Sequence, residues 1–371
     1  MKNKKSRFIT GFVLFLTVCA IYCGIAYADS NSDVIVSLQI DNPVMTVNGE
    51  NQEIDESGTS PVIVNERTLV PVRAIIEAFG GTVSWDNAVK SVLLDINDDT
   101  IKLVIGSNTA YLNGNEEKLD VAPAIINDRT MLPIRFIAEG FNFGVAWEEK
   151  SRTIYIVREC FTDDEYEYLT GEVGGYTGAP YQEINGNKPL FKEYEIIPAS
   201  FEYYSSLDGL KRCNVCYSSI AKDLMPTEAR GSISSVKPTG WKNKAYDFVE
   251  GRYLYNRCHL IGFQLTGENA NKRNLITGTR YLNVDGMLPF ENEVADYIKK
   301  TGNRVIYRVT PVFAGDNLVA DGVLIEAYSV EDNGSGVAFC VYCYNVQPGV
   351  TIDYKTGENT VSAEKQLTYA E

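Results

Sequence analysis

The 371-residue chain is predicted to be an α+β protein built from two unlike halves. The first half contains an internal repeat with an offset of 62 positions, and each copy combines short strands with one helix. The second half, from Pro189 onward, contains apolar runs typical of antiparallel strands and one amphipathic helix between them. A small α+β domain made of two repeats is therefore expected to precede a larger α+β domain built on an antiparallel sheet.

Residues 1–28 have the composition of an export signal. Basic residues lie within the first seven positions, and Phe8 to Ile25 is mostly apolar. Ala26-Tyr27-Ala28 before Asp29 fits a signal-peptidase site. The apolar run is also almost long enough to span a bilayer, so an uncleaved anchor remains the alternative. The sequence predicts an exported protein, secreted or held at the cell surface.

Residues 29–158 contain the repeat. Pro61-Val-Ile-Val-Asn-Glu-Arg-Thr-Leu-Val-Pro recurs as Pro123-Ala-Ile-Ile-Asn-Asp-Arg-Thr-Met-Leu-Pro, and the register is kept as far as Trp85 and Trp147. Self-similarity at a fixed offset indicates two copies of one structural unit.

Each copy predicts a short strand, a turn, and a helix with Pro71 or Pro133 at its first position. Further strands follow around residues 92–94 and 154–156. This pattern resembles the domain named for the N-terminal region of copper amine oxidases, often a paired repeat on exported bacterial proteins. The resemblance implies the fold only, because the repeat has no histidine and lacks the usual copper ligands. A structural or envelope-attachment role is expected.

Residues 159–188 are expected to form a linker. Asp163 to Tyr168 is acidic, and Gly171 to Gly178 is rich in glycine with little apolar periodicity. A short strand is compatible with this segment, but no core is expected from it.

Residues 189–355 contain the strand-rich half. Strands are predicted at residues 195–198, 201–204, 304–311, 322–329 and 337–346. A helix is predicted to begin near Pro289 and to stop at Gly302. Residues 356–371 are predicted to be a polar, frayed tail.

The only histidine of the chain, His259, lies in the run Tyr255-Asn-Arg-Cys-His-Leu-Ile-Gly. A neutral imidazole is the side chain best matched to taking a proton near pH 7. Arg257 stands two positions earlier, and asparagines recur as far as Asn283. Carboxamide oxygens suit Mg²⁺, which keeps most of its waters. A base, a cation and such a ligand are what metal-assisted hydrolysis of a phosphodiester requires.

The order of residues in this stretch resembles the motifs of a known family. Asn256-Arg-Cys-His resembles the Asp-Arg-Gly-His motif of the DNA/RNA non-specific endonucleases, the ββα-metal nucleases. Asn274-Leu-Ile-Thr-Gly-Thr-Arg-Tyr-Leu-Asn and Met287-Leu-Pro-Phe-Glu-Asn look like runs of the secreted streptococcal-type DNases and DNA-entry nucleases. The resemblance covers about residues 191–354 and implies a ββα-metal nuclease domain on an antiparallel sheet.

By this resemblance each site residue acquires an expected role. His259 corresponds to the general base, and Asn283 to the direct Mg²⁺ ligand, with Mn²⁺ as a substitute. Asn274 corresponds to a second active-site asparagine. Glu291 corresponds to the glutamate that holds the metal's water shell, and Arg257 to the motif arginine.

The chain departs from the motif at two positions, with Asn256 where Asp is usual and Cys258 where Gly is usual. The resemblance implies Mg²⁺-dependent hydrolysis of DNA, with RNA as a second substrate left open. Base sequence is not read, because phosphate contacts carry no sequence information. The competing hypothesis is an exported, envelope-associated binding protein whose nuclease domain is inactive.

The net charge of −15 is unevenly distributed. Residues 29–189 carry 11 Lys and Arg against 27 Asp and Glu, whereas residues 190–355 carry 18 against 19. Cations near the motif are Lys242, Lys244, Arg252, Arg257, Lys272, Arg273 and Arg280. A local cationic surface for phosphates and an ordinary solvated face both fit this pattern. The acidic repeat domain is expected to repel DNA.

Six cysteines follow residue 28, four of them in two C-x-x-C pairs. A Zn²⁺ site, a disulfide in an exported protein and free buried thiols all remain open from the sequence. Cys340 and Cys343 lie on a predicted strand, where an odd spacing directs the two side chains to opposite faces.

Overall fold

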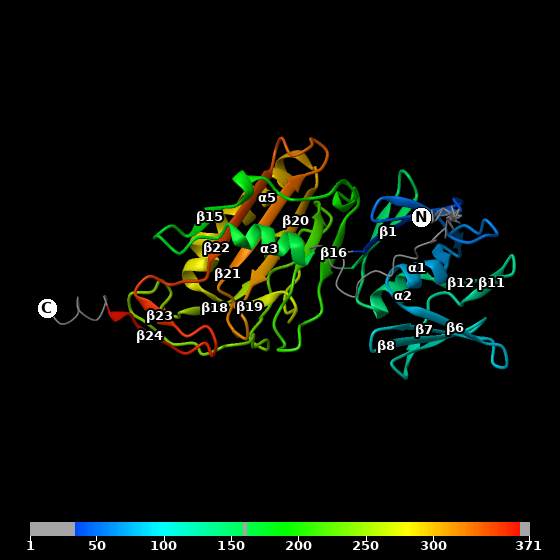
Figure 1. The fold of residues 1–371 in the computed structure, drawn as a ribbon, viewed down its shortest axis with the longest axis horizontal. Coiled ribbons are helices and arrows are strands. Elements are labelled where there is room, and N and C mark those ends of the chain that lie inside the picture. The colour runs from blue at the N-terminus through cyan, green and yellow to red at the C-terminus, as the bar shows by residue number, and fades with distance from the viewer. Residues whose placement is uncertain (1–33, 159–161, 364–371) are drawn as a thin grey trace, which may run out of the picture.

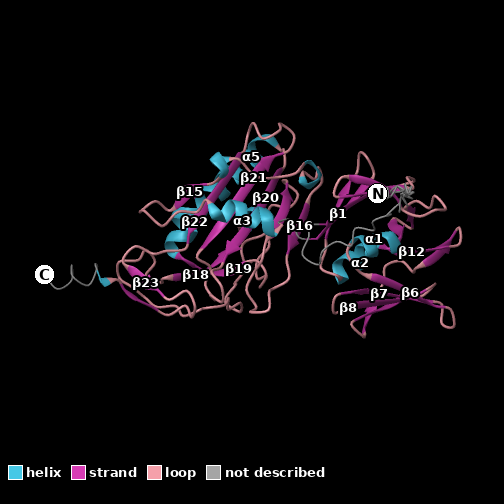
Figure 2. Cartoon of the chain, in the orientation of Figure 1, coloured by secondary structure: helices cyan, strands magenta, loops and turns pink. Residues whose placement is uncertain are grey.

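The structure, a computed structural model, describes residues 34–158 and 162–363 (Figure 1). The expected export signal, Cys160 and residues 364–371 lie outside the described residues. None of the described helices is long and apolar enough to cross a membrane. Antiparallel sheets with few helices make up both halves (Figure 2), so the predicted α+β class is confirmed.

Residues 34–158, called the repeat domain below, contain three sheets. One holds β6 (Thr82–Asp86), β7 (Ser91–Ile96), β8 (Asp99–Val104), β9 (Thr109–Leu112) and β10 (Asn115–Lys118). Another holds β13 (Gly144–Glu148), β14 (Thr153–Arg158), β1 (Val34–Gln39), β2 (Val44–Val47) and β3 (Glu50–Glu53). The third, between the copies, holds β11 (Ala124–Ile126), β12 (Arg129–Pro133), β5 (Arg67–Pro71) and β4 (Val62–Val64).

The two copies are related by an approximate two-fold axis. Equivalent residues Val70 and Leu132 face each other where β5 pairs with β12. The N-terminal strands β1–β3 take the places that β8–β10 occupy in the first copy. Ser91 pairs with Val104 in the first sheet, and the equivalent Thr153 pairs with Gln39 in the second. The N-terminal strands β1–β3 therefore complete the sheet of the second copy.

Helices α1 (Val72–Ala78) and α2 (Ile134–Gly140) cover the inner faces of these sheets. Pro71 and Pro133 were predicted to be the first helical residues, but they are the N-caps, one residue earlier in the helix, and each also ends a strand. Both helices pack into one apolar core shared by the two copies. Sharing this core explains why the copies occur as a pair, since neither helix could bury its apolar face alone.

Residues 162–188 are not a linker. Thr162 caps α3 (Asp163–Gly171) in a reciprocal arrangement with Glu165, and β15 (Tyr181–Glu183) adds an edge strand to the C-terminal sheet. Leu169 and Ile184 are fully buried against that sheet, and Figure 1 shows α3 lying across it. The expectation of no core was wrong, because two apolar residues among many polar ones suffice once a sheet is present to cover.

The C-terminal sheet has six strands in the order β15-β22-β21-β20-β17-β16. The strands other than β15 are β22 (Ala338–Tyr344), β21 (Gly322–Ser329), β20 (Val305–Val312), β17 (Cys216–Ile220) and β16 (Phe201–Tyr204). Four of them lie where the sequence predicted strands, whereas β17 was missed. Strands β20 and β21 are buried along almost their whole length, so both faces of the sheet are covered at its centre.

The strand predicted at 195–198 does not form. Glu193–Glu195 is a 3₁₀ turn instead, and Glu195 is fully buried. Its carboxylate lies 2.9 Å from Arg308 Nη1, while Arg308 Nε lies 2.8 Å from Glu326 Oε2. Burial of a charged group costs free energy unless the group is paired. Because Glu195 must stay beside Arg308, its segment is held outside the sheet.

The predicted frayed tail is also partly wrong. β23 (Val350–Ile352) and β24 (Asn359–Val361) form a hairpin. Asn359 is buried, and its Oδ1 accepts a hydrogen bond from the Tyr246 hydroxyl at 2.8 Å. The Tyr255 hydroxyl donates to the Gly357 carbonyl. Polar residues beyond 355 are thus held by hydrogen bonds that composition does not show.

The repeat domain packs against the β16 edge of the six-stranded sheet. Ala146 and Val157 share an apolar cluster with Phe201 and Tyr203. A Cβ at Gly144 would lie 3.2 Å from Tyr203 Cβ, so the close approach favours glycine there. A sheet edge that is covered in this way is protected from pairing with other chains.

Candidate active site

His259 ends strand β18 (Tyr255–His259), which pairs antiparallel with β19 (Leu275–Thr279). Asn274, directly before β19, is fully buried. Its Oδ1 accepts from the Ile261 amide at 2.8 Å, and its Nδ2 donates to the Ile261 carbonyl at 2.9 Å. Both ends of this carboxamide are therefore used to fix the backbone that follows His259.

The hydrogen bonds of His259 define its tautomer. Nε2 lies 2.8 Å from the Asn269 carbonyl oxygen, which can only accept, so Nε2 carries the proton. Nδ1 is then the acceptor and receives a hydrogen bond from Arg230 at 3.1 Å. Burial lowers the pKa of His259 to about 4, and the charge of Arg230 acts in the same direction. The imidazole is therefore neutral at pH 7, with Nδ1 as its basic atom.

Arg230 is the site residue that sequence reasoning missed. Its guanidinium reaches Nδ1 of His259 from a loop that carries no recognisable motif. Its positive charge also partly opposes the rise in the pKa of Glu291 that burial causes, so Arg230 acts on both His259 and Glu291. The sequence offered no signal beyond the presence of a cation, because only the fold brings residue 230 to residue 259.

Glu291 lies in the first turn of helix α5 (Leu288–Thr301). Desolvation raises the pKa of its carboxyl to about 7, against the opposing effects of a hydrogen bond from Gln264 and the charge of Arg230. A Cβ at Gly262 would overlap this carboxylate. The glycine that closes the His-Leu-Ile-Gly run therefore makes room for Glu291.

Asn283 lies in a π-helical segment, Leu282–Met287, that runs directly into α5. Such wide turns occur frequently at functional sites. Its Oδ1 lies 3.2 Å from Cys258 Sγ, and Cys258 is fully buried. Burial holds the pKa of the Cys258 thiol well above its ordinary value, so the thiol is the donor.

The side chain of Cys258 fits because a glycine, Gly278, lies diagonally across the β18–β19 ladder. A Cβ at Gly278 on β19 would lie 2.6 Å from Cys258 Cβ. The motif usually has glycine at the position of Cys258. In this chain the glycine is Gly278 on the neighbouring strand, and its lack of a side chain leaves room for Cys258. The departure at 258 is thus accommodated without displacing β18.

Arg257 holds the loop in front of the site. Its Nε donates to the Val236 carbonyl at 2.5 Å, and Nη2 donates to the Ser234 carbonyl at 3.1 Å. The guanidinium carbon lies 4.4 Å from the centre of the Trp241 ring. Arg257 therefore orders the loop wall through main-chain contacts and a cation–π contact.

A surface groove of about 500 Å³ is lined by Arg230, Arg257 and Asn283 of the site. Its lining combines guanidinium groups, carboxamides and aromatic rings, from Arg230, Trp241, Asn243, Tyr253, Asn256, Arg257, Arg280 and Asn283, among others. Planar guanidinium groups suit bidentate contacts with phosphate oxygens. Other predicted cations point elsewhere: Lys244 pairs with Glu358, and Arg252 pairs with Asp247.

The donor set fits a hydrated divalent cation. The Asn283 amide oxygen is in direct contact with Cys258. The Glu291 carboxylate is also near Cys258, because its charge contributes to raising the pKa of that thiol. Hard oxygen ligands that are few in number suit Mg²⁺, which retains several waters. Within residues 34–158 and 162–363, no group of three or more His, Cys, Asp and Glu could hold a metal ion.

The described cysteines are free, buried thiols, namely Cys213, Cys216, Cys258, Cys340 and Cys343. Cys340 and Cys343 belong to apolar clusters on opposite faces of β22, as their odd spacing predicted. The sequence left a Zn²⁺ site, a disulfide and free buried thiols open, and these five residues are free buried thiols.

Comparisons with known proteins give two family matches in separate parts of the chain. Residues 46–156 match the family described as copper amine oxidase N-terminal domain, and residues 192–331 match DNA/RNA non-specific endonuclease. A curated deoxyribonuclease of Streptococcus dysgalactiae subsp. equisimilis is 26% identical, and the match covers 42% of this chain. The matched part spans 59% of that relative, about three fifths of its length.

Several solved structures are similar in fold. NucA from Streptococcus agalactiae, solved without metal and with a magnesium ion, is 23% identical with a TM-score of 0.46. The metal-free form covers 54% of this chain and 98% of its own. The Sda1 nuclease with a bound zinc ion is 25% identical with a TM-score of 0.43, covering 50% of this chain and 98% of its own.

The two family matches agree with the two resemblances predicted from the motifs, and both predictions are confirmed. Residues 46–156 are therefore similar to the copper amine oxidase N-terminal domain, and residues 192–331 are similar to the DNA/RNA non-specific endonucleases.

Proposed function

We propose that this protein is an exported, Mg²⁺-dependent, non-specific endonuclease that hydrolyses phosphodiester bonds of DNA, and RNA as a second substrate. The observation that carries the proposal is the state of His259. A neutral imidazole, with its tautomer fixed by Asn269 and its basic Nδ1 directed at a cation beside a groove, is arranged for general-base chemistry. Export is inferred from the signal-like composition of residues 1–28.

His259 takes a proton from the water that attacks phosphorus. Nδ1 is available for this only when Arg230 releases it, because that nitrogen accepts a hydrogen bond from the guanidinium. A phosphate group entering the groove offers Arg230 a stronger, charge-assisted partner than a neutral imidazole. Binding of the substrate therefore frees the base and at the same time places a cation on the phosphoryl oxygens.

Asn283 and Glu291 are the residues that would hold a divalent cation, Asn283 directly and Glu291 through water. A cation bound there supplies charge neutralisation of the phosphate and of the leaving 3′-oxygen. Asn274 acts as a positioning residue through the Ile261 backbone, and Arg257 through the loop it holds. Neither contact reads a base, which agrees with cutting without sequence specificity.

The test uses the purified protein, supercoiled and linear DNA, and RNA, with Mg²⁺ or with a chelator. Parent protein with Mg²⁺ should cut all DNA forms and leave 5′-phosphate ends. His259→Ala should lower turnover by about 10²–10⁴-fold with an unchanged folding transition. Tyr168→Ala, an exposed change on α3, is the matched control and should cut normally.

The inactive binding protein is the alternative that this assay addresses. Parent protein that binds DNA but never cuts it, with any divalent cation, would establish that alternative. A His259→Ala protein that digests DNA at the parent rate would remove the base assignment while leaving the family resemblance intact.

A further inference from the structure

The repeat domain contains two grooves that are related by the repeat itself. The Trp85 groove has a volume of about 800 Å³, and the Trp147 groove has a volume of about 560 Å³. Trp85 and Trp147 are equivalent positions of the two copies. Neither groove contains a residue of the nuclease site, so their occurrence calls for a separate explanation.

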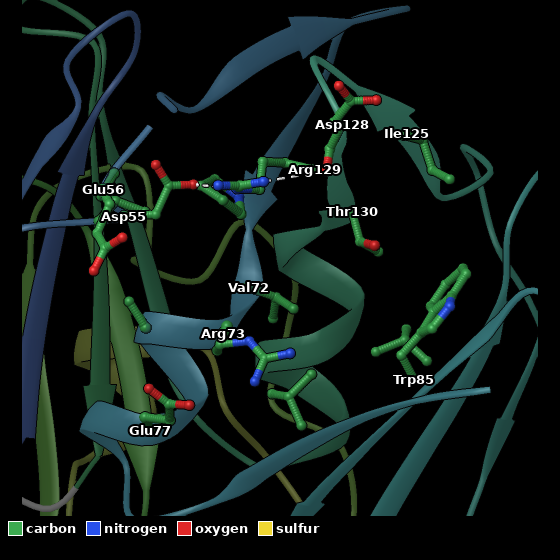
Figure 3. Close-up of a pocket in the computed structure, with 15 residues that line it drawn as sticks. Asp55, Glu56, Val72, Arg73, Glu77, Trp85, Ile125, Asp128, Arg129 and Thr130 are labelled. Carbon is green, nitrogen blue, oxygen red and sulfur yellow. Dashed lines mark hydrogen bonds and ion pairs between the residues drawn. The ribbon is translucent and has the colours of Figure 1, made fainter. Parts of the chain in front are cut away.

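The Trp85 groove is formed where the copies meet. Trp85 on β6 and Arg73 on α1 come from the first copy. Ile125, Arg129 and Thr130, from the β11–β12 hairpin, come from the second copy. In Figure 3, Arg73 projects from its helix into the space between Glu77 and the indole of Trp85.

The Trp147 groove repeats this construction with the copies exchanged. Trp147 on β13 and Arg135 on α2 face Ile63, Arg67 and Thr68 of the β4–β5 hairpin. Each of these five positions is 62 residues from its counterpart in the other groove. The same set of side chains is thus presented twice on one domain.

An ion pair is also duplicated. Arg129 Nε lies 2.9 Å from Asp55 Oδ2, as the dashed line of Figure 3 shows, and Arg67 Nη2 lies 3.1 Å from Asp120 Oδ2. Asp55 and Asp120 each follow the end of an equivalent strand, β3 and β10, by two residues. The pairs hold each hairpin guanidinium beside its groove and leave further N–H groups for a ligand.

Large apolar side chains stay exposed inside these grooves. Trp85 is 39% exposed, Ile125 is 51% exposed, and Ile63 is 45% exposed. Exposed aromatic and aliphatic groups beside fixed polar groups are typical of ligand-binding surfaces. The domain therefore offers two grooves that combine exposed apolar side chains with hydrogen-bonding groups.

The net charge, in contrast, is not repeated. Among its lining residues the Trp85 groove has two arginines against four carboxylates, whereas the Trp147 groove has four cations against three carboxylates. A polyanion would be repelled from the first groove, and a cationic peptide would be disfavoured at the second. A ligand that suits both grooves is therefore electrically neutral.

We propose that the two grooves bind a neutral polysaccharide. The C–H face of a pyranose ring stacks on the indole, and ring hydroxyls accept from the hairpin arginine and donate to its aspartate or to the threonine. A repeating polymer suits a repeated site, because occupation of one groove raises the effective concentration of ligand at the other. Trp85 is expected to dominate, since Trp147 is less exposed and already donates its indole N–H to Glu149.

The experiment is calorimetric titration of the protein from Asp29 to Glu371. The probes are hexasaccharides of glucose, mannose, galactose and N-acetylglucosamine, together with heparin and polylysine as charged probes. At least one neutral hexasaccharide should bind with two sites per chain. Trp85→Ala and Trp147→Ala should each leave one site, and the double variant should leave none. Trp85→Phe, which keeps an aromatic platform, should weaken binding without removing it.

Leu93→Ala is the matched control, because Leu93 is an exposed apolar residue of β7 outside both grooves. Circular dichroism should show that all variants fold, and DNA cutting should match the parent in each. For a long polymer of the binding sugar, loss of either tryptophan should weaken affinity by about tenfold or more. Binding of only heparin or polylysine would overturn the proposal, as would neutral-sugar binding unchanged in the double variant, or no binding of any neutral probe.

Discussion

The Cys258 thiol lies 3.2 Å from the Asn283 amide oxygen and donates a hydrogen bond to it. Burial keeps this thiol protonated, and Met287 Sδ, 3.5 Å away, closes its other side. The residue that departs from the motif thus touches the residue expected to bind the metal. The contact holds the Asn283 carboxamide in one orientation.

Replacement of Cys258 by glycine should leave cutting per folded molecule the same or higher, because glycine is the usual motif residue there. The folded state should lose about 1–3 kcal/mol, since the buried side chain leaves a cavity between β18 and β19. Asn256→Asp, alone or combined with it, should also preserve activity. Urea unfolding and initial cutting rates give the two quantities.

Cys258→Ser is the informative control, because it keeps a donor to Asn283 in nearly the same place. A large loss of activity in Cys258→Gly that serine restores would make the donor functional. Thiol reagents should not inhibit the native protein, since the side chain is fully buried.

His259 should titrate far below the ordinary histidine value of 6.5, near pH 4. As the only histidine of the chain, it gives one imidazole signal in the NMR spectrum of an untagged protein. Arg230→Ala should raise this pKa, because a neighbouring positive charge is removed. Arg280→Ala, which lines the same groove, is the control and should not change it.

The lowered pKa also has a consequence for stability. Its folded-state value lies below the unfolded value, so the unfolded chain takes up the proton first as pH falls from 6.5 to about 4. Stability should therefore decline across this interval by an amount that His259→Asn abolishes. A native signal that titrates near 6.5 would contradict both expectations.

Asn283→Ala should raise the Mg²⁺ concentration needed for half-maximal cutting, and Glu291→Gln should raise it less. The reason is that a direct ligand is lost in the first variant and a water-holding group in the second. The thermal shift caused by Mg²⁺ provides a readout independent of activity. Glu293→Gln, on the same helix, is the matched control, and parent-like titrations for both site variants would place the ligands elsewhere.

Arg308→Ala should destabilise the folded state by about 3–5 kcal/mol, because it leaves Glu195 and Glu326 buried without their guanidinium partner. Arg304→Ala removes a more exposed pair with Glu331 next to the same strand and should cost about 0–1 kcal/mol. Denaturant unfolding of the two variants tests the difference. Equal losses would mean that the buried triad contributes no more than the surface pair.

A protein that begins at Glu159 should fold and cut DNA, whereas one that begins at Lys188 should be strongly destabilised. The shorter protein loses α3 and β15, which cover Cys340 and its neighbours on the sheet. At low salt the Glu159 protein should cut long DNA at least as fast as the full chain, since the acidic repeat domain is absent. Added salt should reduce that difference by screening. A folded Glu159 protein with little affinity for DNA would place the repeat domain in the substrate site.

Motifs and periodicity predicted the repeat, most C-terminal strands, helix α5 and the residues around His259. These features depend on local order in the chain, which a sequence displays directly. Arg230 was missed because only folding brings its loop to His259. Residues 162–188 were misjudged because Leu169 and Ile184 acquire their burial from a sheet that forms more than a hundred residues later.

The pairing of Val34 with Arg158 bears on how far the proposed nuclease domain can reach. Residues paired across an antiparallel ladder lie about 5 Å apart, so the repeat domain receives and returns the chain at nearly one point. A folded unit of this kind adds bulk but almost no tether length between whatever precedes Val34 and the domain that begins at Thr162. If the N-terminus is held at a cell surface, the distance of the nuclease from that surface is set by the docked contact between the two domains. Lengthening the chain outside that contact, and not duplicating the repeat, is what would extend it.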